Sequence, residues 1–205
     1  MADEEKKEST DCPEPQEKTS WQQNFLLYLH DLTHLLAVIM LCFILLFRFV
    51  VVSGPSMFST LWDGDWLLVL SSVFYHNPQY GDIIIASKDS FNDGEPIVKR
   101  VIATEGQTVD IDFGSGIVYV DGVALDEDYT NTATSNAEGM TFPLVVDDGC
   151  LFVMGDNRAH SKDSRDPEIG LIDKREVLGK AIFLMLPGTH GGELERDFDR
   201  IGALK

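Results

Sequence analysis

Two residues of this sequence, Ser56 and Lys99, have side chains that could act together as a nucleophile and its base. Ser56 follows Gly54 and Pro55 in the stretch SGPSMFSTL. Glycine permits a sharp bend, proline fixes φ, and a serine on such a turn can point its hydroxyl and its own N–H into one cleft. The same pattern is also typical of an ordinary turn, and a serine hydroxyl is a poor nucleophile without a base.

Lys99 is the candidate base, because it lies in the β-branched run PIVKRVIA. Strand alternation sends Lys99 and Arg100 to opposite faces, so one can point inward while the other stays in solvent. Burial among apolar groups disfavours the ammonium form and lowers the pKa, and a neutral amine can accept a serine proton. The alternative is an edge-strand lysine that discourages aggregation, which is the commoner use of lysine in a sheet.

A third group of polar residues, GDNRAHSKDSR, follows the apolar run CLFVM and supplies enough donors and acceptors for a rigid network. Its charged and polar members are Asp156, Asn157, Arg158, Ser161, Asp163, Ser164 and Arg165. A solvated, salt-bridged turn is the alternative, but this density beside a core strand favours a site. His160 lies in the same stretch, so a Ser-His-Asp triad is a second, less well supported possibility.

Composition argues against several classes of function. The formal net charge of -18 and the pI near 4.4 leave little basic surface to follow phosphates, so we expect no nucleic-acid partner. The three cysteines, Cys12, Cys42 and Cys150, are too scattered for a disulfide framework or a metal site.

The N-terminal quarter predicts a membrane anchor. Residues 1–20 hold seven acids, three lysines and almost no apolar surface, so we expect a disordered acidic tail. Residues 21–34 place Trp, Phe, Tyr and Leu at helical spacing, which suits the headgroup region. Residues 35–52 are apolar over about the length that spans roughly 30 Å of hydrocarbon, and Arg48 near their end can snorkel to the interface.

We expect this run to be retained, because a cleaved signal begins with a short basic region and this leader is long and acidic. A buried core helix is the alternative. Lys6, Lys7 and Lys18 precede the run and only Arg48 flanks its other end, which favours a cytoplasmic N-terminus.

Residues 53–205 contain short β-rich runs separated by Gly, Asp and Asn turns, which predict a mostly antiparallel β domain. Residues from about 110 to 150 are more acidic and polar, and the stretch DEDYTNTATSNAEGM is too loose to belong to a core. We interpret them as an inserted subdomain with a hairpin around YVDG, attached to the main sheet.

Four motifs in this order resemble the bacterial type I signal peptidases, membrane-bound serine proteases with a Ser-Lys dyad. They are SGPSMFSTL, YGDIII, VKRVIATEGQTV and VMGDNRAHSKDSR, with the anchor before them and VLGKAIFLMLPG after them. The resemblance covers most of residues 35–188. It implies an antiparallel catalytic β domain of the signal-peptidase and LexA-like type, with one N-terminal transmembrane helix.

The resemblance also implies roles for individual residues. Ser56 corresponds to the nucleophile, Lys99 to the general base that later protonates the leaving amine, and Ser161 to the serine that orients this lysine. The backbone N–H of Ser56 would hold the oxyanion, because Gly54 stands where some members have a serine hydroxyl. The site framework would comprise Asp163 and Arg165, supported by Asp156, Asn157 and Arg158.

The implied reaction is acyl transfer through a serine acyl-enzyme, without metal or other cofactor. The implied substrates are secretory preproteins with small residues at the first and third positions before the cut, as in Ala-x-Ala. The other implied partners are the lipid bilayer and, by proximity, the secretion translocon. The implied location is the plasma membrane, with a single span and an extracytoplasmic catalytic domain.

Three stretches depart from the family pattern. Ser59 replaces a usual proline, ATEGQTV replaces Gly-Leu-Pro-Gly-Asp-x-Val, and SKDSRDPEIG lacks an aromatic residue after the arginine. None removes Ser56 or Lys99, so we expect activity. The alternatives are a LexA-like self-cleaving repressor, which would carry a DNA-binding segment in place of the anchor, and a catalytically silent membrane adaptor, which would be free to lose either residue.

Overall fold

The computed structural model describes residues 21–189 and 196–204, so the predicted acidic tail, Cys12 and His190 lie outside the described residues. The chain divides into two compact units, Met1–Cys42 and Phe43–Lys205. Each is considered by itself.

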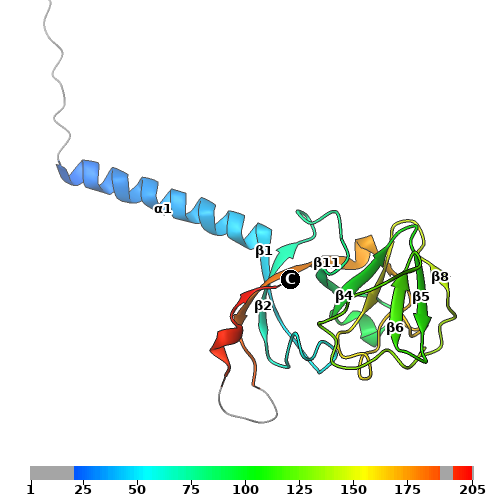
Figure 1. Ribbon diagram of the computed structural model, residues 1–205. Coiled ribbons are helices and arrows are strands. Elements are labelled where there is room, and N and C mark those ends of the chain that lie inside the picture. The colour runs from blue at the N-terminus through cyan, green and yellow to red at the C-terminus, as the bar shows by residue number, and fades with distance from the viewer. Residues whose placement is uncertain (1–20, 190–195, 205) are drawn as a thin grey trace, which may run out of the picture. The chain divides into compact units, whose positions relative to one another are not determined.

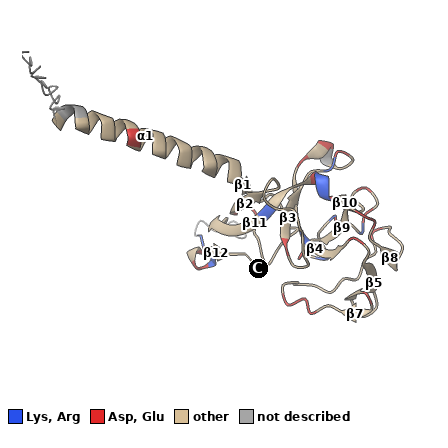
Figure 2. Cartoon of the chain, turned by 90° about the horizontal axis from the view of Figure 1, so that it is seen from above, with Lys and Arg blue, Asp and Glu red and all other residues tan. Residues whose placement is uncertain are grey.

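The N-terminal unit contains most of a single helix, α1 (Trp21–Leu46). Residues Asn24–Leu46 are apolar and long enough to cross a membrane, since 23 residues at about 1.5 Å each extend for about 35 Å. Asp31 is the one charged residue of α1 (Figure 2).

The helix ends earlier than the apolar run does. Residues 47–51, the last part of the expected 35–52 span apart from Val52, form strand β1 (Phe47–Val51) instead. Aromatic and β-branched side chains favour this conformation, and pairing with β2 satisfies the backbone of the segment. Hydrophobicity alone did not distinguish the two conformations, because the run is apolar across the boundary.

The second unit is built from antiparallel strands, as the sequence predicts (Figure 1). The main sheet has the strand order β1-β2-β11-β3-β4-β9-β10, and β12 pairs with β11. Its other strands are β2 (Trp66–Ser71), β3 (Ile83–Ala86), β4 (Ile97–Thr104), β9 (Cys150–Met154), β10 (Ile172–Asp173), β11 (Val177–Leu186) and β12 (Gly202–Ala203). Three short 3-10 turns are η1 (Asn92–Gly94), η2 (Lys174–Glu176) and η3 (Phe198–Arg200).

A smaller sheet with the order β7-β6-β5-β8 forms the inserted part of the chain. Its strands are β5 (Thr108–Asp112), β6 (Ile117–Val120), β7 (Val123–Ala124) and β8 (Leu144–Val145). Strands β6 and β7 make the hairpin predicted around YVDG, with Asp121 and Gly122 both at positive φ, as a two-residue hairpin turn requires.

The two sheets share a hydrophobic core, so the insertion is firmly packed. Val109 and Val118 from the small sheet lie in one buried cluster with Ile102 and Phe152 from the main sheet. The expectation that DEDYTNTATSNAEGM stays outside the packed structure is wrong at Thr134, whose side chain is fully buried.

A second cluster lies under the segment after β1. Met57 and Leu61 are fully buried there against Leu67, Ile83 and Leu184 of the main sheet. These two side chains hold the turn that carries Ser56 onto the sheet.

Candidate active site

Ser56 and Lys99 are brought together by the fold. The Lys99 Nζ lies 2.9 Å from the Ser56 Oγ and donates to the carbonyl of Val98 at 3.0 Å. Lys99 is 5% exposed, so the amine has been removed from water almost completely. The pairing has the distance that proton transfer between a nucleophile and its base requires.

Burial lowers the pKa of Lys99 to about 8, against the opposing influence of the carboxylates of Asp163, Asp156 and Glu138. The ammonium loses more stabilisation by leaving water than the neighbouring negative charges give back to it. At neutral pH roughly a tenth of the amine is therefore already neutral and able to accept a proton.

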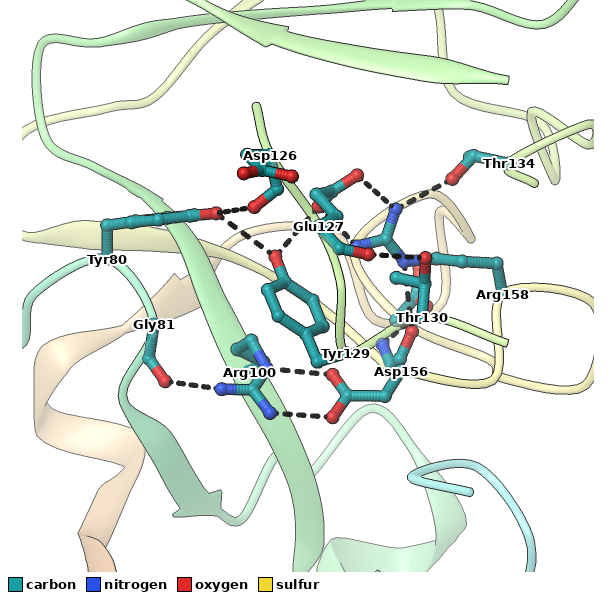
Figure 3. Close-up of polar contacts among 12 residues, drawn as sticks. Tyr80, Gly81, Arg100, Asp126, Glu127, Tyr129, Thr130, Thr134, Asp156 and Arg158 are labelled. Carbon is teal, nitrogen blue, oxygen red and sulfur yellow. Dashed lines mark hydrogen bonds and ion pairs between the residues drawn. The ribbon is translucent and has the colours of Figure 1, made fainter. Parts of the chain in front are cut away.

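Arg100 is buried as well, at 3% exposure, so the expectation that one of the two basic residues stays in solvent is wrong. Its Nε and Nη2 donate to the two carboxylate oxygens of Asp156 at 2.8 and 2.7 Å, and its Nη1 donates to the carbonyl of Gly81 at 2.8 Å (Figure 3). Alternation along β4 does place the two side chains on different faces, but each face is covered.

The turn that carries Ser56 is short and hydrogen-bonded. Gly54 has a φ of 87°, a conformation that favours glycine, and its N–H donates to Asp63 Oδ1 at 2.8 Å. The N–H of Phe58 donates to the carbonyl of Pro55 at 3.1 Å. Within the described residues, the N–H of Ser56 has no hydrogen-bond acceptor.

The polar loop predicted from GDNRAHSKDSR packs directly on this turn. The backbone N–H of Asn157 donates to the carbonyl of Ser56 at 3.0 Å, and its side-chain amide donates to the carbonyl of Pro55 at 3.1 Å. Gly155 comes so close that a Cβ at this position would lie 2.4 Å from the Ser56 carbonyl oxygen and 2.2 Å from Ser161 Oγ. Only glycine permits this approach.

Asp163 and Arg165 form a fully buried ion pair with two hydrogen bonds of 2.8 Å. Asp163 also accepts from the N–H of Gly155 at 3.0 Å, and Arg165 donates to the carbonyl of Arg158 at 3.0 Å. The pair therefore fixes both ends of the segment that contacts Ser56.

Two further predicted residues have different surroundings. Ser161 is buried, but its described hydrogen bond runs to the carbonyl of Lys162 at 3.4 Å and not to Lys99. His160 is exposed, with Nδ1 3.3 Å from Asn157 Oδ1, whereas the described partner of the Ser56 hydroxyl is Lys99. The geometry thus gives a Ser-His-Asp triad no support.

A groove of about 360 Å³ opens beside Ser56 and Lys99, between residues 50–53 and residues 95–99. Both walls are strand edges. Within the described part of the chain, strand β1 pairs with β2 alone. Residues 97–99 of β4 pair there with β3 alone, because pairing with β9 begins at Arg100.

Sequence reasoning missed three residues near this site, namely Thr60, Glu127 and Tyr129. Thr60 donates to Asp156 Oδ2 at 2.5 Å, the Tyr129 ring lies 4.1 Å from the Arg100 guanidinium, and Glu127 binds Arg158. No spacing rule marks them, although three arginines around one loop indicate that additional carboxylates are needed.

The chain is similar to known proteins over most of its length. The family model described as signal peptidase, peptidase S26, matches residues 26–186. A probable signal peptidase I-1 from Synechocystis sp. is 37% identical over 172 residues, which cover 78% of this chain and 84% of the relative. A signal peptidase I from Bacillus licheniformis is 37% identical over 150 residues, which cover 69% of this chain and 78% of the relative. The crystal structure of a signal peptidase I from Enterococcus faecalis aligns with a TM-score of 0.42 at 32% identity, over 51% of this chain and 96% of that chain.

Proposed function

Because this chain belongs to the signal peptidase family, peptidase S26, we propose that Ser56 and Lys99 are the dyad with which it cleaves signal peptides from secretory preproteins. The family makes the protein a membrane-anchored serine-type endopeptidase with signal peptidase I function. The 2.9 Å contact between the Lys99 amine and the Ser56 hydroxyl is the observation that carries the assignment of the dyad.

In the proposed reaction, neutral Lys99 accepts the Ser56 proton as Oγ attacks the scissile carbonyl. The resulting ammonium then donates that proton to the leaving amine, which leaves an ester on Ser56 and a neutral Lys99. Lys99 next takes a proton from water as the resulting hydroxide attacks the ester. When this tetrahedral intermediate collapses, the ester C–O bond breaks, the Lys99 ammonium returns its proton to Ser56 Oγ, and the carboxyl product leaves. The oxyanion accepts from the N–H of Ser56, which has no partner within the described residues, and Gly54 adds no side-chain donor.

The groove suits a peptide in extended conformation. Its two strand edges offer unpaired main-chain groups, so a substrate can bind as an added strand. Side chains alternate along a strand, so those at the first and third positions before the cut point to the same wall. The aliphatic side chains of Val50, Val52, Ile97 and Val98 line the groove and favour small residues there, as in Ala-x-Ala.

The remaining assignments concern location. We assign the N-terminus, with the tail of residues 1–20, to the cytoplasm, and the catalytic domain, residues 53–205, to the extracytoplasmic side of the plasma membrane. Helix α1 supplies the single span, and the exposed side chains of Phe49 and Trp66 provide apolar surface for lipid. This arrangement would bring the dyad to preproteins as they leave the translocon.

Cleavage of a preprotein with an Ala-x-Ala site tests the proposal. The full-length protein in detergent is compared with Ser56→Ala and Lys99→Met, and the new N-terminus is read by mass spectrometry. We expect cleavage after the second Ala by the wild type and none by either variant. Unchanged cleavage by Lys99→Met would overturn the assigned base, and an inactive wild type would favour a silent adaptor.

A further inference from the structure

One loop of the inserted part, residues 126–134, contacts two of the three buried arginines of the site, Arg100 and Arg158 (Figure 3). Glu127 accepts from Arg158 Nη1 at 2.9 Å and from Nη2 at 2.5 Å, so the pairing is bidentate. The Glu127 side chain is 10% exposed and the Arg158 side chain is 1% exposed. Tyr129 donates to the same carboxylate at 2.8 Å, which fixes its orientation.

Arg158 connects the Glu127 carboxylate to the turn that carries Ser56 through a short series of hydrogen bonds. Its Nε donates to the carbonyl of Gly155 at 3.1 Å, and its Nη1 also donates to Thr134 Oγ1 at 2.7 Å. Between Gly155 and Arg158 lies Asn157, which donates to the carbonyls of Ser56 and Pro55. Residues 155–158 contact the turn that carries Ser56, and residues 126–134 contact residues 155–158 from the other side of Arg158.

A second contact reaches the other arginine. The ring of Tyr129 lies under the Arg100 guanidinium at 4.1 Å, and Arg100 is the neighbour of Lys99 on β4. The Tyr129 hydroxyl lies 3.3 Å from that of Tyr80, which joins the loop to the segment before β3.

We propose that residues 126–134 act as a latch that presses Gly155–Arg158 onto the nucleophile turn, with Glu127 as the positioning residue of the latch. The inference rests on the proposed role of Ser56 and assigns to the insertion a part in the reaction. Without Glu127 a buried guanidinium would lose its carboxylate, and the segment that it anchors would shift.

The contacts of Glu127 define what its loss should change. Glu127 does not line the groove beside the dyad. Its removal should therefore lower kcat by misplacing Ser56, while KM stays close to that of the wild type. Loss of a residue that only stabilises the fold would lower the fraction of folded protein and would leave the kcat of the folded protein unchanged.

The experiment measures kcat and KM of the full-length protein in detergent with the Ala-x-Ala preprotein, and separately the rate at which Ser56 reacts with a small fluorophosphonate. For Glu127→Gln we expect both kcat and the labelling rate to fall by about 10- to 100-fold. Glu127→Asp should recover part of the loss. Asp148→Asn, at an exposed residue outside the latch with the same change of charge, is the matched control and should behave as the wild type.

Two outcomes would overturn the latch. One is unchanged kcat in Glu127→Gln. If that variant does not fold, Tyr129→Phe is measured instead, because it keeps the ring on Arg100 and removes only the hydroxyl that orients Glu127. A wild-type kcat in Tyr129→Phe would then be the second outcome that overturns the latch. A wild type that neither cleaves nor reacts would instead overturn the dyad itself, and the latch with it.

Discussion

At the scale of single residues, the Lys99 amine is subject to two opposing influences. Burial lowers its pKa to about 8, while Asp163, Asp156 and Glu138 favour the ammonium and raise it. Only the neutral amine can act as the base, so kcat/KM should rise with pH and reach its half-maximal value near the pKa of Lys99.

Glu138 offers a way to move that midpoint without touching the dyad. Its Oε1 lies 3.6 Å from Arg165, and burial raises the pKa of its own carboxyl. Glu138→Gln removes a negative charge that raises the pKa of Lys99, so the pKa should fall and the acid limb of kcat/KM should move to lower pH. The pH profiles of wild type, Glu138→Gln and the control Asp148→Asn, measured with one peptide substrate, check this. A shift to higher pH would contradict the assigned electrostatics.

The chemistry of single residues was accessible to sequence reasoning to different degrees. Ser56 and Lys99 are candidates because each stands in a local pattern, a Gly-Pro turn and a β-branched run, but those patterns alone left the ordinary turn and the edge-strand lysine open, and the resemblance to the signal peptidases supplied the roles. The burial of Arg100 was not predicted, because its cover comes from Tyr129 and Asp156, which are distant in sequence. The same holds for Glu127, whose role depends entirely on which arginine the fold brings to it.

At the scale of elements, the C-terminal segment holds the far side of the nucleophile turn. Arg200 donates to the two carboxylate oxygens of Asp65 at 3.0 and 2.7 Å and to the carbonyl of Thr60 at 3.1 Å. Its guanidinium also lies 3.8 Å from the centre of the Trp62 ring. Asp65 is fully buried and also accepts from the N–H groups of Trp62 and Gly188, but Arg200 supplies the positive charge that compensates it.

Arg200→Met should therefore lower the free energy of unfolding by about 2–4 kcal/mol, because it leaves a buried carboxylate without its positively charged partner. Denaturant unfolding of the full chain in detergent measures the change. Arg175→Met is the matched control, since Arg175 also pairs with an aspartate, Asp173, but is 89% exposed, and it should have no measurable effect. Equal losses in the two variants would show that burial of Asp65 is not the reason.

The elements themselves were predicted well in kind and less well in extent. Period and turn residues sufficed for an antiparallel β domain and for the hairpin at Asp121 and Gly122. The end of α1 at Leu46 was not predicted, because the apolar run continues into β1, where pairing with β2 decides the conformation. The packing of the insertion was underestimated, because the stretch 126–140 is polar and its buried contacts are ionic.

At the scale of the whole molecule, residues 53–205 hold 26 acidic and 12 basic residues, so the catalytic domain carries a formal net charge of -14 and sets up a negative field. Its acidic residues are spread over the loops (Figure 2). Such a field attracts basic substrates before contact and weakens as salt screens it. A preprotein with a basic segment beside its cleavage site should therefore lose kcat/KM as sodium chloride is raised from about 0.05 to 0.5 M.

The matched control is the same preprotein with that segment neutral, whose kcat/KM should change little over this range. Equal salt dependence of the two substrates would mean that the charge of the enzyme does not steer binding.

The two strand edges of the groove, those of β1 and β4, have a consequence for inhibition. A strand-shaped inhibitor would take much of its affinity from main-chain N–H and carbonyl groups of the enzyme. A substitution in the enzyme does not remove these main-chain groups, except that proline lacks the N–H. Point mutations would therefore have few ways to confer drug resistance, and those available would change the aliphatic wall that the natural substrates also need.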